Sequence, residues 1–105
     1  MRRAGKQFIR LLVEKDFNSA YQMLAEPFKK RVLPERFPEF LAESGIANIQ
    51  RSIADEFNIS LAGHGEFIAH LQRSDDSYVE ATVTLGKVAG EWKVFLIQIK
   101  VPLLR

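Results

Sequence analysis

Helical spacing of apolar residues dominates the first part of the chain. Between residues 4 and 15 the apolar side chains recur at three- and four-residue steps, which is the period of an amphipathic helix. The side chains that this helix is predicted to bury are Phe8, Leu11 and Leu12. The helix is predicted to end near Asp16, and a second helix follows with Asn18 or Ser19 as its predicted N-cap.

Prolines and one glycine divide the remainder of this half. Pro27 is predicted to end or tighten the second helix, with one further turn over residues 28–32. Pro38 fits the first turn of a third helix, and Gly45 is predicted to follow that helix as the left-handed C-cap residue. Residues 1–45 are therefore predicted to form a helical half.

In the second half the apolar period changes from near four to two. Residues 46–56 have helical spacing but also fit the start of a strand, so they are interpreted as a transition. Over residues 57–101 apolar and polar side chains alternate between turn-forming residues, which predicts a meander of about four antiparallel strands. The predicted strands are 57–62, 67–72, 78–85 and 91–101.

The last predicted strand has apolar residues on both faces. One face carries Trp92, Val94 and Leu96, and the other carries Phe95, Ile97, Ile99 and Val101. Such a strand is expected to lie centrally or to be covered on both sides, by helices on one side and by a partner subunit on the other. The sequence therefore predicts a homodimer whose interface includes Trp92, Val94 and Leu96.

Length and composition bound the class of protein. The 105 residues suffice for one hydrophobic core, so a single α+β domain over residues 1–105 is predicted, with N-terminal helices packed on a four-stranded antiparallel sheet. A net charge of +2 is a small excess, so no nucleic-acid partner is expected. The absence of cysteine excludes disulfides, thiolate metal sites and a cysteine nucleophile.

No apolar run in the sequence approaches the ~20 residues that a membrane-spanning helix needs. The chain as given is therefore expected to be soluble. The opening Met1-Arg2-Arg3 is also compatible with a cut after a removed leader or anchor, so an extracytoplasmic location is left open.

Four segments carry a resemblance to a known superfamily. They are Phe8–Leu12 followed by Lys15–Tyr21, then Leu33–Phe37, and finally Gly90–Val94. Their order resembles the nuclear transport factor two-like, or cystatin-like, superfamily, which includes the ketosteroid isomerase-like enzymes. The resemblance implies a curved antiparallel sheet wrapped around helices as a cone. Because that superfamily includes isomerases, dehydratases, transport factors and domains with no known reaction, it implies a fold rather than one activity.

An isomerase-like site needs a carboxylate base in an apolar pocket and a donor that holds an oxyanion. The residues that could meet in such a pocket are Tyr21, His70, Tyr78 and Glu80. However, Val79, Ala81, Val83 and Leu85 make the opposite face of the third strand the better core face. This places Tyr78 and Glu80 in solvent or at a subunit contact, and no catalytic residue is assigned.

Other chemistry-bearing residues fit plainer roles. His64 lies between two glycines, and Asp75 and Asp76 fit a hairpin turn, so neither a metal nor a cofactor is expected. A basic patch toward a lipid surface or nucleic acid could be formed by Lys29, Lys30 and Arg31 with Arg2, Arg3, Lys6 and Arg10. A solvated helix face is favoured instead, because glutamates lie close to these residues in sequence.

The sequence therefore predicts a non-enzymatic binding or interaction domain that self-associates through its sheet. The alternative is a small-molecule-binding protein, or an isomerase- or dehydratase-like enzyme, with a pocket for a small apolar ligand between helices and sheet.

Overall fold

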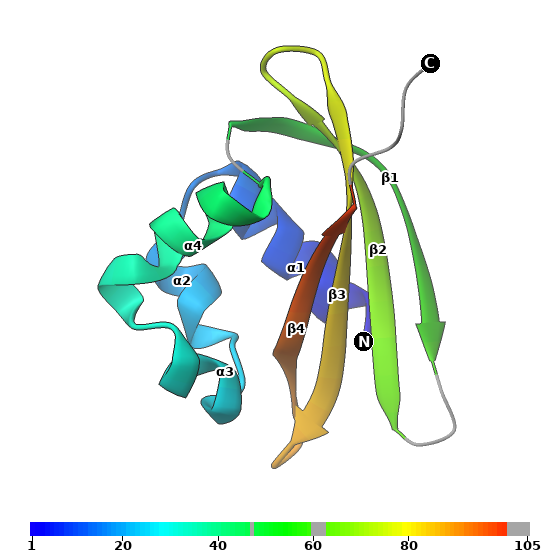
Figure 1. The fold of residues 1–105 in the computed structure, drawn as a ribbon. Helices are drawn as coiled ribbons and strands as arrows, with labels where there is room; N and C mark the ends of the chain where they lie inside the picture. The colour runs from blue at the N-terminus through cyan, green and yellow to red at the C-terminus, as the bar shows by residue number, and fades with distance from the viewer. Residues whose placement is uncertain (47, 60–62, 101–105) are drawn as a thin grey trace.

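Helices precede strands along the whole chain in the computed structural model, which describes residues 1–46, 48–59 and 63–100 (Figure 1). The helices are α1 (Arg2–Val13), α2 (Phe17–Gln22), α3 (Glu26–Arg31), the 3₁₀ turn η1 (Pro34–Arg36) and α4 (Phe37–Ser44). The strands are β1 (Ile49–Ile59), β2 (His64–Arg73), β3 (Tyr78–Val88) and β4 (Glu91–Lys100). The predicted α+β class, with N-terminal helices on a four-stranded antiparallel sheet, is confirmed.

Two details of the helical half differ from the prediction. Asp16 is the N-cap of α2 and accepts a hydrogen bond from the Ser19 amide at 3.3 Å, so the predicted N-cap at Asn18 or Ser19 was wrong. Pro27 lies in the first turn of α3, where its missing N–H costs no helical hydrogen bond, and it does not end α2. Gly45 follows α4 with φ of 104°, which confirms the predicted left-handed cap.

The four strands form a meander in the order β1-β2-β3-β4, and every neighbouring pair is antiparallel. β1 begins at Ile49, so most of the segment interpreted as a transition belongs to a strand. Nearly all of its side chains are exposed because β1 is an edge strand, and register shifts after Ile49 and Ser52 disturb its alternation. Residues 60–62 of the predicted first strand lie outside the described residues.

All four helices lie on one side of the sheet (Figure 1). The core between the two layers includes Phe8, Leu12, Phe28, Phe37 and Leu41 from the helices and Phe67, Val83 and Leu85 from the strands. The predicted core face of β3 is confirmed, since Val79, Ala81, Val83 and Leu85 are all buried. No described helix covers the other side, which we call the open face (Figure 1).

Strand β4 departs most from its prediction. Leu96 pairs with Thr84 whereas Val94 pairs with Leu85, so Phe95 is an extra residue that moves Val94 and Leu96 to opposite sides of the sheet. Val94 is buried in the core and Leu96 is exposed on the open face. The expectation that Trp92, Val94 and Leu96 share a face was therefore wrong, and Val101 lies outside the described residues.

Of the two alternatives predicted for the last strand, a central position is wrong, because β4 is an edge of the sheet. Its outer edge is nevertheless bonded to the segment between α2 and α3. The Ala25 amide donates to the Val94 carbonyl at 2.7 Å, and the Val94 amide donates to the Met23 carbonyl at 2.8 Å. These bonds anchor the helical layer to the sheet and shield the middle of the β4 edge.

Candidate functional site

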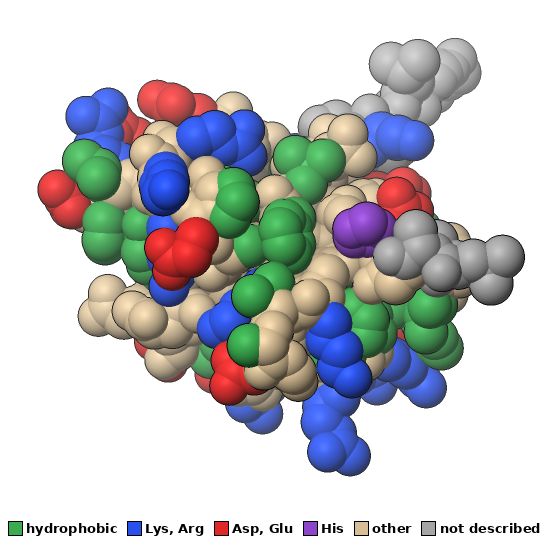
Figure 2. Space-filling model, turned by 90° about the horizontal axis from the view of Figure 1, so that it is seen from below, with side chains coloured by type: hydrophobic (Ala, Val, Ile, Leu, Met, Phe, Trp, Pro, Cys, Tyr) green, Lys and Arg blue, Asp and Glu red, His purple; other side chains and the backbone are tan. Residues whose placement is uncertain are grey.

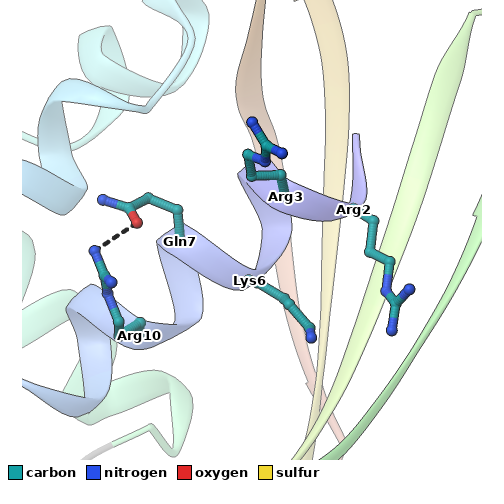
Figure 3. Close-up of a pocket in the computed structure, with 5 residues that line it drawn as sticks. All are labelled: Arg2, Arg3, Lys6, Gln7 and Arg10. Atoms are coloured by element: carbon teal, nitrogen blue, oxygen red, sulfur yellow. Dashed lines mark hydrogen bonds between the residues drawn. The ribbon is translucent and has the colours of Figure 1, made fainter.

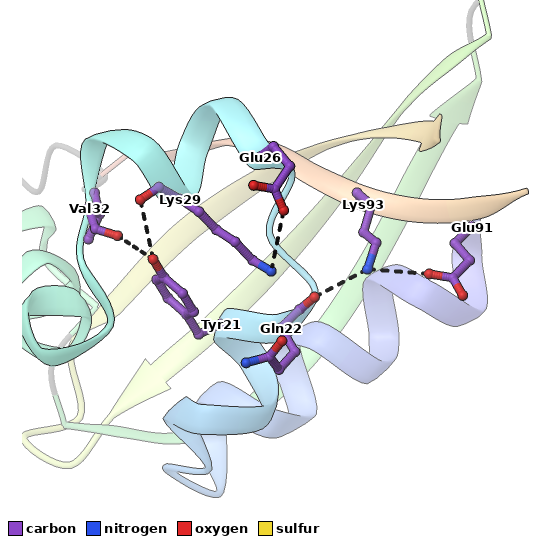
Figure 4. A network of polar contacts seen from close by, with 7 residues as sticks. All are labelled: Tyr21, Gln22, Glu26, Lys29, Val32, Glu91 and Lys93. Atoms are coloured by element: carbon purple, nitrogen blue, oxygen red, sulfur yellow. Dashed lines mark hydrogen bonds and ion pairs between the residues drawn. The ribbon is translucent and has the colours of Figure 1, made fainter. Parts of the chain in front are cut away.

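Tyr21 lies inside the helical layer (Figure 4). Its hydroxyl donates to the Val32 carbonyl at 2.7 Å, and its ring meets the edge of Phe37 with centroids 5.6 Å apart. Burial raises the pKa of this phenol above its usual value, and the nearby carboxylates Glu35 and Glu26 raise it further. These contacts tie α2 to the segment that follows α3.

The other three residues of the predicted pocket lie across the sheet from Tyr21. His70 on β2 and Tyr78 and Glu80 on β3 all belong to the open face, where Tyr78 is 52% exposed. His70 and Glu80 are direct cross-strand neighbours, with Nδ1 4.0 Å from Oε1. The structure therefore brings His70 and Glu80 together, but Tyr21 does not share a pocket with them.

A third group completes this arrangement on the open face. Glu56 on β1 places its Oε2 3.1 Å from His70 Nε2, so the imidazole lies between carboxylates from both neighbouring strands. A protonated His70 can direct one N–H toward each carboxylate. Sequence reasoning missed Glu56 because it lies in the segment interpreted as a transition. Within the described residues no group of three or more His, Cys, Asp or Glu side chains has metal-site geometry.

The remaining side chains of the open face follow from the register. From β1 to β4 they form the rows Asn58, Glu66, Thr84, Leu96, then Glu56, Ile68, Thr82, Gln98, then Ala54, His70, Glu80, Lys100. Tyr78 and Gln72 form a further pair beyond these rows. The face is therefore polar at most positions but also carries Ile68, Tyr78 and Leu96, over which residues 1–46, 48–59 and 63–100 place no second layer.

A separate cleft lies between the helical layer and the sheet, where α1 passes over β1. This open cleft has a volume of about 400 Å³. Buried Ile9 and Phe67 are part of its wall, and Lys6, Ser52 and Asp55 line it with polar groups. None of Tyr21, His70, Tyr78 and Glu80 is among the residues that line it.

The basic residues of the helical half form two groups rather than one patch. Arg2, Arg3, Lys6 and Arg10 line a depression of about 590 Å³ along α1, together with Gln7 (Figure 3). On α3, Lys29 is 4.0 Å from Glu26, and the Arg31 guanidinium lies 5.5 Å from the Phe28 ring centroid. Lys29 and Arg31 line other depressions, so they do not extend the α1 group.

Among the described residues, every helix falls short of the length and apolarity that crossing a membrane requires. Comparison of the chain with protein-family models, with curated proteins and with solved structures found no match. The arrangement of four helices over an antiparallel four-stranded meander is compatible with the nuclear transport factor two-like fold.

Proposed function

We propose that this protein is a non-enzymatic binding domain that forms a homodimer through the open face of its sheet. The observation that carries the proposal is that, within the part of the chain that the structure describes, no helix covers one face of the sheet, which nevertheless presents exposed Tyr78 and Leu96. Antiparallel sheets tolerate one solvated face when that face is polar. Apolar side chains there are better accommodated against a second protein surface.

The size of the open face supports a second copy as the occupant. Strands of 10 or 11 residues at ~3.3 Å per residue, in four rows ~4.8 Å apart, give a face of roughly 33 by 19 Å. Two such faces in contact bury on the order of 1,200 Å², which is the lower end of the range for specific interfaces. A face-to-face contact between two copies is therefore large enough for a stable, if modest, dimer.

The polar groups of the open face are compatible with such burial. Glu80 lies between His70 and Lys100 in the register, and Glu56 is ion-paired to His70 when the imidazole is protonated. Thr82, Thr84 and Gln98 are short or neutral side chains that can hydrogen-bond across an interface. Glu56, His70 and Glu80 thus have neighbouring charged or polar groups on their own copy, which lowers the cost of excluding water from them.

We also infer that the chain is a member of the nuclear transport factor two-like superfamily. The segments quoted from the sequence and the order of helices and strands support this inference. Because that fold serves many activities, the inference supports a binding role only at the level of architecture.

Substitution of Leu96 by Glu tests the dimer. Leu96→Glu places a charge in the proposed interface, whereas Leu33→Glu makes the same change at a residue on the helical side that is 56% exposed. Sedimentation equilibrium should show dimers for the unmodified chain and for Leu33→Glu, and monomers for Leu96→Glu. A monomeric unmodified chain at the highest attainable concentration would rule out self-association, and dissociation by both variants would place the interface elsewhere.

The cleft between α1 and β1 favours small-molecule binding as a second candidate. Its volume of about 400 Å³ lies within the range of roughly 300–1,000 Å³ typical of ligand sites, and Ile9, Val13 and Phe67 give it an apolar wall. Ligand-detected NMR with a panel of small apolar compounds should show saturation transfer that Val13→Trp abolishes by filling the cleft. Transfer that is unchanged in Val13→Trp would remove this candidate.

A further inference from the structure

The solvent side of α1 is strongly basic. Arg2, Arg3, Lys6 and Arg10 are all exposed, and no acidic residue occurs within Arg2–Val13. Figure 3 shows Arg3, Gln7 and Arg10 along one side of the helix and Arg2 and Lys6 along the side nearer the strands. Because these charges lie within a helix of 12 residues, they produce one local positive field.

Two exposed apolar side chains lie beside the start of α1. Phe57 pairs with Phe67, and Ile59 pairs with Gly65. Phe67 and Gly65 both face the helical layer, so the side chains of Phe57 and Ile59 project from β1 on the side of the sheet that carries α1. Phe57 is 43% exposed and Ile59 is 61% exposed. The Arg2 guanidinium lies 5.6 Å from the centroid of the Phe57 ring. Because Arg2 also lines the α1 depression with Arg3, Lys6 and Arg10, it joins the cations of α1 to this apolar edge of β1.

We call this set the basic-apolar surface, and it consists of Arg2, Arg3, Lys6, Arg10, Phe57 and Ile59. Two acidic residues adjoin this surface, since Asp55 lines the cleft with Lys6 and Glu66 lines a depression with Ile59, so its four cations exceed the acidic residues beside it by two. Seen from below, the molecule has Lys and Arg side chains next to hydrophobic side chains along part of its surface (Figure 2). The α3 cations differ, since Lys29 has Glu26 within 4.0 Å.

We propose that the basic-apolar surface binds peripherally to a bilayer that contains anionic lipid. Anionic headgroups complement the cations of α1, and each Lys or Arg near such a surface contributes about fivefold to binding. Phe57 and Ile59 can enter the boundary between headgroups and acyl chains, as the apolar residues of interfacial proteins do. A nucleic acid also offers phosphates, but it offers no apolar phase for the aliphatic side chain of Ile59.

This surface is distinct from the open face used for the proposed dimer. Phe57 and Ile59 project to the helical side, whereas Leu96 and Tyr78 belong to the opposite side of the sheet. Membrane binding and self-association can therefore occur together. An experiment that rules out one of these two proposals does not rule out the other.

Vesicle co-sedimentation tests the proposal. The full chain is mixed with vesicles of phosphatidylcholine alone or with about a third phosphatidylserine, at low and physiological salt. Binding is expected for the anionic vesicles, with a marked decrease at higher salt because the charges of exposed groups are screened. Equal binding to the two kinds of vesicle, or no binding to either, would overturn the proposal.

Matched variants distinguish an effect of the basic-apolar surface from an effect of the net charge of the protein. Arg3→Glu with Arg10→Glu should weaken binding at least tenfold, and Ile59→Ser should weaken it severalfold. Lys30→Glu with Arg31→Glu makes the same change of charge on exposed residues of α3 and should have a much smaller effect. Equal losses from the two double variants would overturn the assignment to α1. Tighter binding to a fluorescent oligonucleotide than to anionic vesicles at the same salt would assign the surface to nucleic acid instead.

Discussion

Gly5 of α1 lies directly against Phe67 of β2. A Cβ built at position 5 would lie 2.7 Å from the Phe67 Cβ and would overlap the ring. Phe67 is 1% exposed and is held on both sides by strand pairing, so it cannot move away. The glycine therefore permits the close approach of the first helix to the sheet, and with it the position of the cleft and of the basic-apolar surface.

Substitution of Gly5 by Ala should destabilise the protein although alanine is the better helix former. The gain in helix propensity is about 1 kcal/mol, whereas overpacking a filled core costs roughly 1–3 kcal/mol. The free energy of unfolding measured with urea should therefore fall. Gly65→Ala is the matched comparison, because its new Cβ would meet the side chain of the N-terminal residue Met1, and it should destabilise the protein less than Gly5→Ala. A stabilised Gly5→Ala variant would contradict this packing.

Removal of the Tyr21 hydroxyl should weaken the helical layer. In Tyr21→Phe the buried Val32 carbonyl loses its donor at 2.7 Å, which should lower the free energy of unfolding by about 1–2 kcal/mol. Tyr78→Phe removes a hydroxyl from a side chain that is 52% exposed and should change stability little. Equal effects of the two variants in urea unfolding would argue against a specific role for the Tyr21 hydrogen bond.

The raised pKa of Tyr21 also predicts a loss of stability at alkaline pH. Its folded-state pKa is raised above 10.0 mainly by burial, so between the unfolded and folded pKa values the unfolded chain binds fewer protons than the folded chain. Stability should therefore fall as the pH rises through about 10, and the decline should be shallower in Tyr21→Phe. Parallel stability profiles for the two proteins from neutral to alkaline pH would contradict this linkage.

One substitution in the hairpin between β3 and β4 should increase the thermal stability of the protein. Val88 pairs with Glu91, and the two residues between them, Ala89 and Gly90, have φ of 53° and 85°. This two-residue turn favours Asn-Gly, and an alanine with positive φ costs roughly 1–2 kcal/mol. Ala89→Asn should therefore raise the midpoint of thermal unfolding, whereas Gly90→Ala should lower it.

The hairpin between β2 and β3 should make the stability of the fold depend on pH in the acidic range. Asp75 accepts hydrogen bonds from the Ser77 hydroxyl at 2.5 Å and from the Ser77 amide at 3.0 Å, and these bonds lower the pKa of its carboxyl below the usual 3.8. The ionised carboxylate therefore stabilises the fold above that value, and its contribution is lost as the pH falls through the folded-state pKa. Asp75→Asn keeps an acceptor in the turn but should lose part of the acid dependence, measured as the difference in unfolding midpoint between neutral and acidic buffer.

The proposed sites show where sequence reasoning was limited. The pair His70 and Glu80 could be predicted to share a face, because each alternates with core residues on its strand. Glu56 could not, since an edge strand with bulges and few buried side chains has no clear period of two. Likewise, nothing local separates the cations of α1 from those of α3, because their separation depends on where the two helices pack.

The sequence by itself determined the division into a helical half and a strand half, the cap at Gly45 and the buried face of β3. These features are local, since they depend on the spacing of apolar residues and on the backbone freedom of particular residue types. Only the tertiary structure decided that Tyr21 lies across the sheet from His70, and that Phe95 is an extra residue which turns Leu96 outward. The physical reason is that pairing partners and layer order arise from contacts between segments far apart in the chain, which no local periodicity records.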